Sequence, residues 1–114
     1  MKWFLVRYIY EIISGDGGYR VQFDEQLRLI SADTGNDAIC KAEGMADDFH
    51  PPFRNYKGEL VEWKFICIAG LHEIQTPTDG AEVTSILHEP HDALDFRAQI
   101  DKRKEFLDNA IGVL

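Results

Sequence analysis

The first thirteen residues place the strongest constraint on the fold of this chain. Residues 2–13 carry apolar side chains at alternating positions on both sides of a strand. One side has Trp3, Leu5, Ile9 and Ile13, and the other has Phe4, Val6, Tyr8, Tyr10 and Ile12. A strand that is apolar on both sides lies at the centre of a sheet, where each face is covered or meets another molecule.

Two hairpins and two helices follow from the remaining pattern. A glycine-rich turn at 14–18 leads into residues 19–31, which alternate with apolar side chains on one side only and predict a hairpin. Helical spacing follows a cap at Thr34 or Asn36 and ends near Phe49, because two prolines come next. Residues 61–72 and 81–88 alternate as strands. A second helix starts near residue 90.

These elements predict a two-layer α+β fold in the order ββαββα. The simplest sheet is antiparallel and four-stranded, with the strands at 2–13 and 61–72 in the centre and those at 19–31 and 81–88 at the edges. Both helices are expected on one face of this sheet. A length of 114 residues fits a single domain spanning 1–114.

Charge and cysteine content limit the classes of partner. The net charge is −8, and the few basic residues are scattered, so neither nucleic acid nor an anionic membrane surface is an expected partner. No apolar run approaches the roughly 18 residues of a membrane helix. Arg7 interrupts any signal-peptide core, so we predict a cytoplasmic protein. Cys40 and Cys67 lie within apolar patterns and are predicted to be buried, free thiols.

No catalytic motif is present, so we expect no cofactor, and the sequence favours a protein without enzyme activity over an enzyme. Weak candidates for metal ligands are His72, His88, His91 and Asp92, but their spacing matches no established zinc pattern. Our leading prediction is a non-enzymatic protein-interaction module that self-associates. The alternative is a small-molecule or metal-binding protein, or an enzyme, with a site near Asp24 and Glu25 or near residues 88–92. Cross-strand ion pairing is the commoner role of such carboxylates.

The loop at 51–58 combines aromatic and basic residues in an acidic protein. Loops carry recognition more often than cores do, so Phe53, Arg54 and Tyr56 are candidates for binding a ligand or partner. Packing of the aromatic side chains across the sheet edge is an equally weighted alternative.

The face of the sheet away from the helices is the more informative feature. If the helices cover Trp3, Leu5, Val21, Phe23, Trp63 and Phe65, the other face is a contiguous apolar patch. The interface candidates on it are Phe4, Val6, Tyr8, Tyr10, Ile66, Ile68 and Ile86. The simplest partner is a second copy, giving a homodimer, with another protein as the alternative. Tyr8→Lys or Ile68→Lys would then dissociate the assembly without unfolding the monomer. An immunity-like protein whose acidic surface covers a basic partner is a further alternative.

Several segments resemble one bacterial family. They are Trp3 to Arg7, Phe23 to Ile30, Trp63 to Phe65 and Asp79 to Val83, within a resemblance over roughly residues 2 to 100. The chain is similar to the "domain of unknown function 4288" family. The resemblance implies a small bacterial cytoplasmic protein and assigns no activity, cofactor or catalytic residue.

Overall fold

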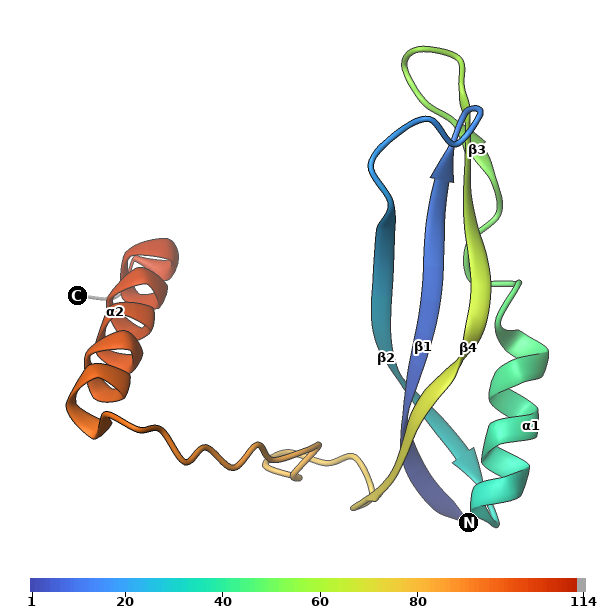
Figure 1. Cartoon of the computed structure of the whole chain (residues 1–114). Helices are drawn as coiled ribbons and strands as arrows, with labels where there is room; N and C mark the ends of the chain where they lie inside the picture. Colours follow the sequence, from blue (N-terminus) through green and yellow to red (C-terminus); the bar gives the residue numbers. More distant parts are fainter. Residues whose placement is uncertain (113–114) are drawn as a thin grey trace. The chain divides into compact units, whose positions relative to one another are not determined.

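The computed structural model describes residues 1–112 and has the α+β element order ββαββα that the sequence predicts (Figure 1). Its elements are β1 (Lys2–Ser14), β2 (Gln22–Ala32), α1 (Gly35–Met45), β3 (Phe53–Arg54), β4 (Leu60–Ile74) and α2 (Ala93–Ile111). The two compact units are Met1–Thr84, called here the sheet unit, and the segment from Ser85 onward, which contains α2. The predicted apolar tail at 110–114 ends in Val113 and Leu114, which lie outside the described residues.

The sheet has four antiparallel strands in the order β2-β1-β4-β3, so the two-sided first strand lies in the interior as expected (Figure 1). The long hairpin of β1 and β2 runs without a break from Lys2 opposite Ala32 to Ile12 opposite Gln22. The fourth strand differs from the prediction: it is the two-residue β3, paired with β4 at Val61 and Leu60. Residues 81–88 form no strand. Within them only Ala81 is partly buried, so their alternation has no buried face to stabilise it.

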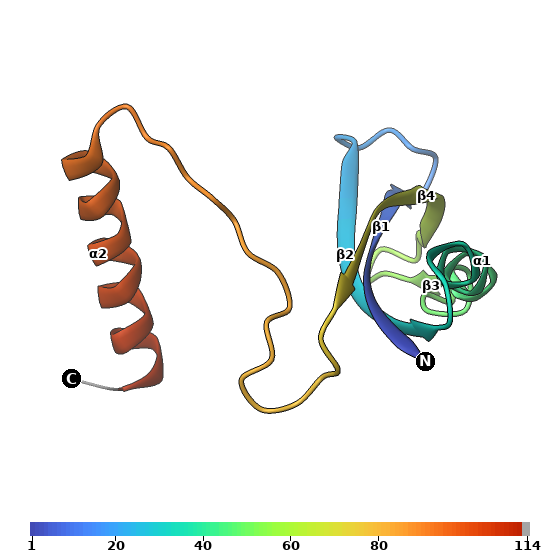
Figure 2. The same cartoon turned by 90° about the horizontal axis from the view of Figure 1, so that it is seen from below.

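The helix α1 packs on one face of the sheet through three alanines (Figure 2). Of the two predicted caps, Thr34 and Asn36, it is Thr34 that forms the N-cap, and its hydroxyl accepts a hydrogen bond from the backbone N–H of Asp37. Ala38, Ala42 and Ala46 are fully buried, which lets the helix approach the strands closely. The helix ends at Met45, four residues before the predicted end at Phe49.

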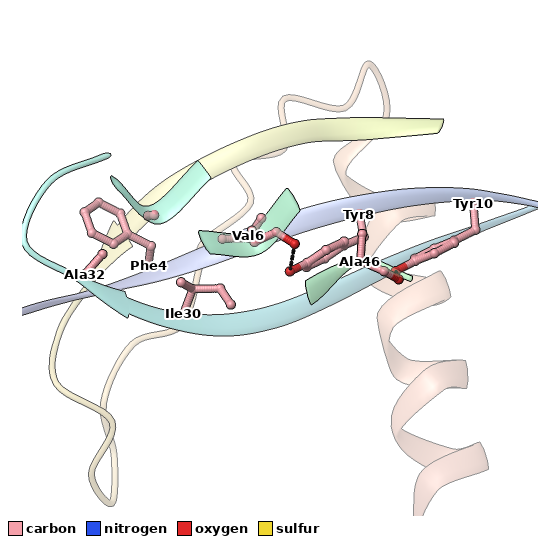
Figure 3. Packing of buried hydrophobic residues seen from close by; sticks show 9 residues of the cluster. Phe4, Val6, Tyr8, Tyr10, Ile30, Ala32 and Ala46 are labelled. Carbon is pink, nitrogen blue, oxygen red and sulfur yellow. Dashed lines mark hydrogen bonds between the residues drawn. The ribbon is translucent and has the colours of Figure 1, made fainter. Parts of the chain in front are cut away.

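The core lies between α1 and the face of the sheet that the sequence pattern assigned to a partner. Phe4, Val6, Tyr8 and Tyr10 are all buried and lie in one row along β1 (Figure 3). The hydroxyl groups of Tyr8 and Tyr10 donate hydrogen bonds to the backbone carbonyls of Ala42 and Ala46, at 2.9 and 2.6 Å. The prediction that these four residues form an exposed interface is therefore wrong. A two-sided strand does not reveal which of its faces the helix will cover.

Two bulges in β4 explain further departures from strict alternation. The register against β1 shifts between Arg7 and Tyr8 and again between Ile9 and Tyr10, which leaves Ala69 and Ile66 of β4 without a partner. Each extra residue reverses the alternation beyond it. Ile68 consequently packs against the core, and Cys67 is exposed instead of buried. Cys40 is also exposed, on the side of α1 away from Ala38 and Ala42.

The helix α2 has Asp92 as its N-cap, whose carboxylate accepts from the backbone N–H of Asp95, and it ends at Gly112 in the left-handed conformation. Two ion pairs at i,i+4 spacing, Arg97–Asp101 and Lys104–Asp108, lie along it. No helix within residues 1–112 is both long and apolar enough to cross a membrane.

Candidate functional site

The face of the sheet opposite α1, called here the open face, carries apolar side chains from β1 and β2, which are exposed along β2 and buried or half-buried along β1. Alternation along β1 and its register with β2 place on it Trp3, Leu5, Ile9, Ile13, Phe23, Leu27 and Leu29. The three from β2 are the most exposed, at 63 % for Phe23, 47 % for Leu27 and 46 % for Leu29. The sequence pattern pointed these β2 residues at the core, so the apolar surface exists but on the opposite face from the one predicted.

Charged residues interrupt the open face, where Glu11 lies opposite Lys64 and where Arg7 forms an ion pair with Glu25. Arg7 Nη1 lies 3.4 Å from Glu25 Oε1, and both side chains are more than a third exposed. Since Asp24 and Glu25 are adjacent in a strand, their side chains point to opposite faces of the sheet. These two carboxylates therefore do not converge into one site, as a pair of residues for acid–base catalysis near Asp24 and Glu25 would need.

Asp24 belongs instead to a polar network on the α1 side of the sheet. Its Oδ2 atom accepts hydrogen bonds from Gln26 Nε2 at 2.7 Å and from Trp63 Nε1 at 3.1 Å. Gln26 also contacts His50 Nε2 at 2.6 Å and accepts from Arg28 Nη2 at 3.0 Å. The network links β2, the loop after α1 and β4, and it tethers the outer strand across β1.

Aromatic stacking completes this cluster. The His50 ring stacks on Trp63 with centroids 5.3 Å apart, and it meets Tyr10 edge-on. The Arg28 guanidinium lies 3.5 Å from the centroid of Phe49. The sequence pattern placed Gln26 and Arg28 on the solvent-facing side of their strand and His50 in a loop. It therefore did not predict the contributions of these side chains to the network.

The hydrogen bond from Gln26 to Asp24, with a second from Trp63, lowers the pKa of the Asp24 carboxyl below its ordinary value. The carboxylate stays charged at neutral pH and is poorly suited to exchange a proton there. The network is therefore an anchoring device of the fold.

The acid stability of the sheet unit should depend on Asp24. Because the folded-state pKa is lowered, its stabilisation is present above the unfolded value of 3.8 and is lost as the pH falls through the folded value. We expect Asp24→Asn to lower the free energy of unfolding by about 1 kcal/mol at neutral pH. The free energy of unfolding of this variant should also differ less between neutral pH and pH ~3 than that of the wild type. Urea titrations at both pH values measure this effect. Glu25→Gln, on the open face, is the matched control, and an equal loss in both variants would contradict the assignment.

The predicted metal ligands do not form a cluster. Among residues 1–112, no three side chains of His, Cys, Asp or Glu come together in a way that could hold a metal ion. His72 lies on β4 opposite Leu5. In the second unit the His88 ring packs against Phe96, with centroids 5.0 Å apart, His91 is exposed, and Asp92 caps α2.

The three predicted loop residues have separate roles. Phe53 packs on Trp63, with ring centroids 5.9 Å apart, and Arg54 Nη1 donates to the carbonyl of Gly58 at 2.8 Å. Packing therefore explains these two side chains. Tyr56 is 93 % exposed and lines a cleft with residues of the β1–β2 turn.

Comparison with known proteins identifies the sheet unit. The model of the family described as "Domain of unknown function (DUF4288)" matches residues 3–85. The chain belongs to the DUF4288 family. Its match ends where the sheet unit ends, so the DUF4288 domain comprises the sheet, α1, the open face and the cleft, and it excludes α2. No curated protein and no solved structure matches the chain.

Proposed function

We propose that this DUF4288 protein is a non-enzymatic interaction module that self-associates by pairing β2 with β2 of a second copy. The observation that carries the proposal is the outer edge of β2 together with its exposed apolar side chains. β2 is eleven residues long and stands at the end of the strand order β2-β1-β4-β3 (Figure 1). Long edge strands with apolar side chains are templates for pairing with another chain, and monomeric proteins usually protect them.

A side chain from α1 covers one end of this edge, and Asp24, Glu25 and Arg28 place charges along the rest of it. Lys41 Nζ donates to the carbonyl of Ser31 at 2.8 Å, which covers β2 next to α1. From Gln22 to Ile30, no strand of the sheet unit pairs with the outer side of β2. Proline, which is common on protected edges, is absent from this segment.

Self-pairing of β2 is compatible with a closed dimer. Two identical strands that pair antiparallel are related by a two-fold axis perpendicular to the sheet, so the contact is isologous and cannot extend into a fibre. The axis keeps each face of the sheet on the same side, and each residue then lies opposite a partner residue of the same face.

The charges of β2 select the register. When the two-fold axis passes through Gln26, Asp24 lies opposite Arg28 of the second copy and Phe23 lies opposite Leu29. Each of these pairs occurs twice, once on each side of the axis. A register centred on Glu25 would place two carboxylates opposite each other, which destabilises a sheet. A register centred on Leu27 pairs no opposite charges. We therefore assign the dimer to the register centred on Gln26.

The ion pair of the open face favours edge pairing over stacking of two open faces. Stacking would remove Arg7 and Glu25 from water, and the cost of desolvating two charges can exceed their mutual attraction. Edge pairing leaves both in solvent and brings the exposed β2 side chains together.

Two charged substitutions at Leu27 test the register. Leu27 lies opposite Glu25 of the second copy, so Leu27→Asp should set two carboxylates together on each side of the axis. We expect a rise of about tenfold or more in the dimer dissociation constant for Leu27→Asp, whereas Leu27→Lys can pair with Glu25 and should stay dimeric. Sedimentation velocity over a range of protein concentrations measures both constants.

Tyr56→Asp is the matched control, because it adds the same charge at an exposed aromatic residue of the loop between β3 and β4. Dissociation by both Leu27 variants would instead indicate stacked open faces and overturn the edge register. A wild-type protein that remains monomeric at every concentration would exclude self-association altogether.

A further inference from the structure

At the end of the sheet away from the N-terminus, the β1–β2 turn and the loop between β3 and β4 enclose a cleft of about 300 Å³. Its lining residues are Ser14, Tyr19, Arg20, Gln22, Asn55, Tyr56, Lys57 and Glu59. The cleft lies within the sheet unit, and neither the fold nor the proposed β2 pairing accounts for the side chains of Arg20, Tyr56 and Lys57 in it.

The two rims of the cleft are fixed to each other. The Tyr19 hydroxyl donates to the Glu59 carboxylate, with oxygen separations of 2.6 and 2.7 Å, and the backbone N–H of Gly15 donates to the carbonyl of Leu60 at 2.8 Å. Gly15 adopts a φ of 59°, and a Cβ atom there would lie 2.7 Å from Glu59 Oε2. The Glu59 side chain could move to admit a Cβ atom, so it is the left-handed backbone conformation of Gly15 that favours glycine where the two loops meet.

The loop that carries Tyr56 and Lys57 is also held in place. Asn55 Oδ1 accepts hydrogen bonds from the backbone N–H groups of Lys57 and Glu59, at 2.9 and 3.0 Å. The Gly58 N–H donates to the Asn55 carbonyl, and Gly58 has a φ of 77°. A cleft with pre-formed walls loses little conformational entropy when a ligand enters.

The chemistry of the cleft differs from the rest of this acidic chain. Lys57 Nζ lies 5.8 Å from the centroid of the Tyr19 ring and 5.7 Å from that of Tyr56, so a cation sits beside two aromatic rings. Among residues 1–112, neither Lys57 nor Arg20 takes part in an ion pair. The carboxylate of the cleft, Glu59, already accepts hydrogen bonds from Tyr19 and from Asn55 Nδ2. The lining side chains therefore carry two positive charges and one negative charge, that of Glu59, and the Asp16 carboxylate acts on Glu59 from the adjacent turn.

We propose that this cleft binds a small molecule that carries a flat ring and an anionic group. The ring stacks on Tyr56 and Tyr19, and the anion lies between Arg20 and Lys57. Gln22 supplies an amide group for polar substituents of the ring, whereas the Asn55 amide is used to hold the loop. The volume of the cleft suits a molecule of roughly mononucleotide size, at the lower end of the range for small-molecule sites.

The probes are adenosine 5′-monophosphate and 4-hydroxybenzoate, with adenosine and inorganic phosphate as controls that lack one of the two required parts. Titration of the ¹⁵N-labelled full chain, followed by NMR, should shift amide signals of residues 14–22 and 55–59 on addition of at least one probe. The control compounds should bind about tenfold more weakly or not at all, because each makes only half of the contacts. Preference for one probe distinguishes a phosphate from a carboxylate ligand.

Three variants locate the binding. Tyr56→Ala and Lys57→Met change exposed side chains and should each weaken binding about tenfold while leaving the thermal midpoint unchanged. Lys2→Met, at the opposite end of β1, is the control and should bind as the wild type does. If no probe shifts these amide signals at millimolar concentration, or if Tyr56→Ala and Lys57→Met bind with unchanged affinity, the assignment of the cleft is overturned.

Discussion

Replacing Tyr8 by Lys is expected to unfold the sheet unit. The Tyr8 side chain has no exposed surface, lies beside Tyr10 and packs edge-on against Phe49. Its hydroxyl donates to the Ala42 carbonyl at 2.9 Å. A Lys side chain at this position would bury a charge without a partner and leave the carbonyl unsatisfied, at a cost of about 5 kcal/mol or more. That cost is comparable with the whole stability of a typical domain, about 5–15 kcal/mol.

Tryptophan fluorescence during a urea titration measures this effect, because Trp3 and Trp63 both lie in the sheet unit. Tyr8→Phe, which removes only the hydroxyl, should cost about 1 kcal/mol. Leu27→Lys places the same charge on the open face and should keep a transition close to that of the wild type. If Tyr8→Lys unfolded cooperatively with the same urea midpoint as the wild type, the Tyr8 side of β1 would not be the core.

Enlarging Ala42 should separate α1 from the sheet. Ala42 is fully buried, and its carbonyl accepts the Tyr8 hydrogen bond, so the backbone of α1 lies close to the strands at this point. A leucine side chain would push the helix outward and lengthen the hydrogen bonds from Tyr8 and Tyr10. We expect Ala42→Leu to lower the free energy of unfolding by about 1–3 kcal/mol.

Cys40→Leu is the matched control for this substitution. Cys40 lies on the same helix but is exposed, so its enlargement should change the free energy of unfolding by less than about 0.5 kcal/mol. Both variants are measured by the same fluorescence-detected urea titration. Equal effects at the two positions would mean that α1 does not depend on its alanine face for docking.

The two largest expected effects concern Tyr8, which the sequence pattern assigned to a partner surface, and Ala42, which it placed on the apolar face of the first helix. The assignment of Tyr8 depends on the face of β1 that α1 covers. The tyrosines of β1 can reach carbonyl groups of α1, which gives a polar reason for the observed arrangement, since a buried hydroxyl needs a hydrogen-bond partner. Leu5 and Ile9, on the other side of β1, have no polar side-chain group that needs a helix carbonyl.

The open face and the β2 edge were therefore only partly predictable. The two-sided pattern of residues 2–13 does indicate that one apolar face lies free of α1. It does not say which one, and the polar residues of β2 were misleading, because Asp24, Gln26 and Arg28 satisfy each other beside the core instead of facing water. A hydrogen-bonded network of this kind leaves no periodic signal in the sequence.

The sequence by itself determined the elements that local chemistry controls. These are the β1–β2 hairpin with its glycine turn, the cap of α1 at Thr34 or Asn36, the interior position of β1, the element order and the family. Each depends on residues close together in the chain or on the period of apolar side chains. Tertiary structure decided which face α1 covers, the bulges of β4 that expose Cys67, the short edge strand β3, and the cleft between two turns forty residues apart. These features arise from contacts between distant segments, where close packing and the pairing of buried polar groups select among arrangements that the local pattern leaves equivalent.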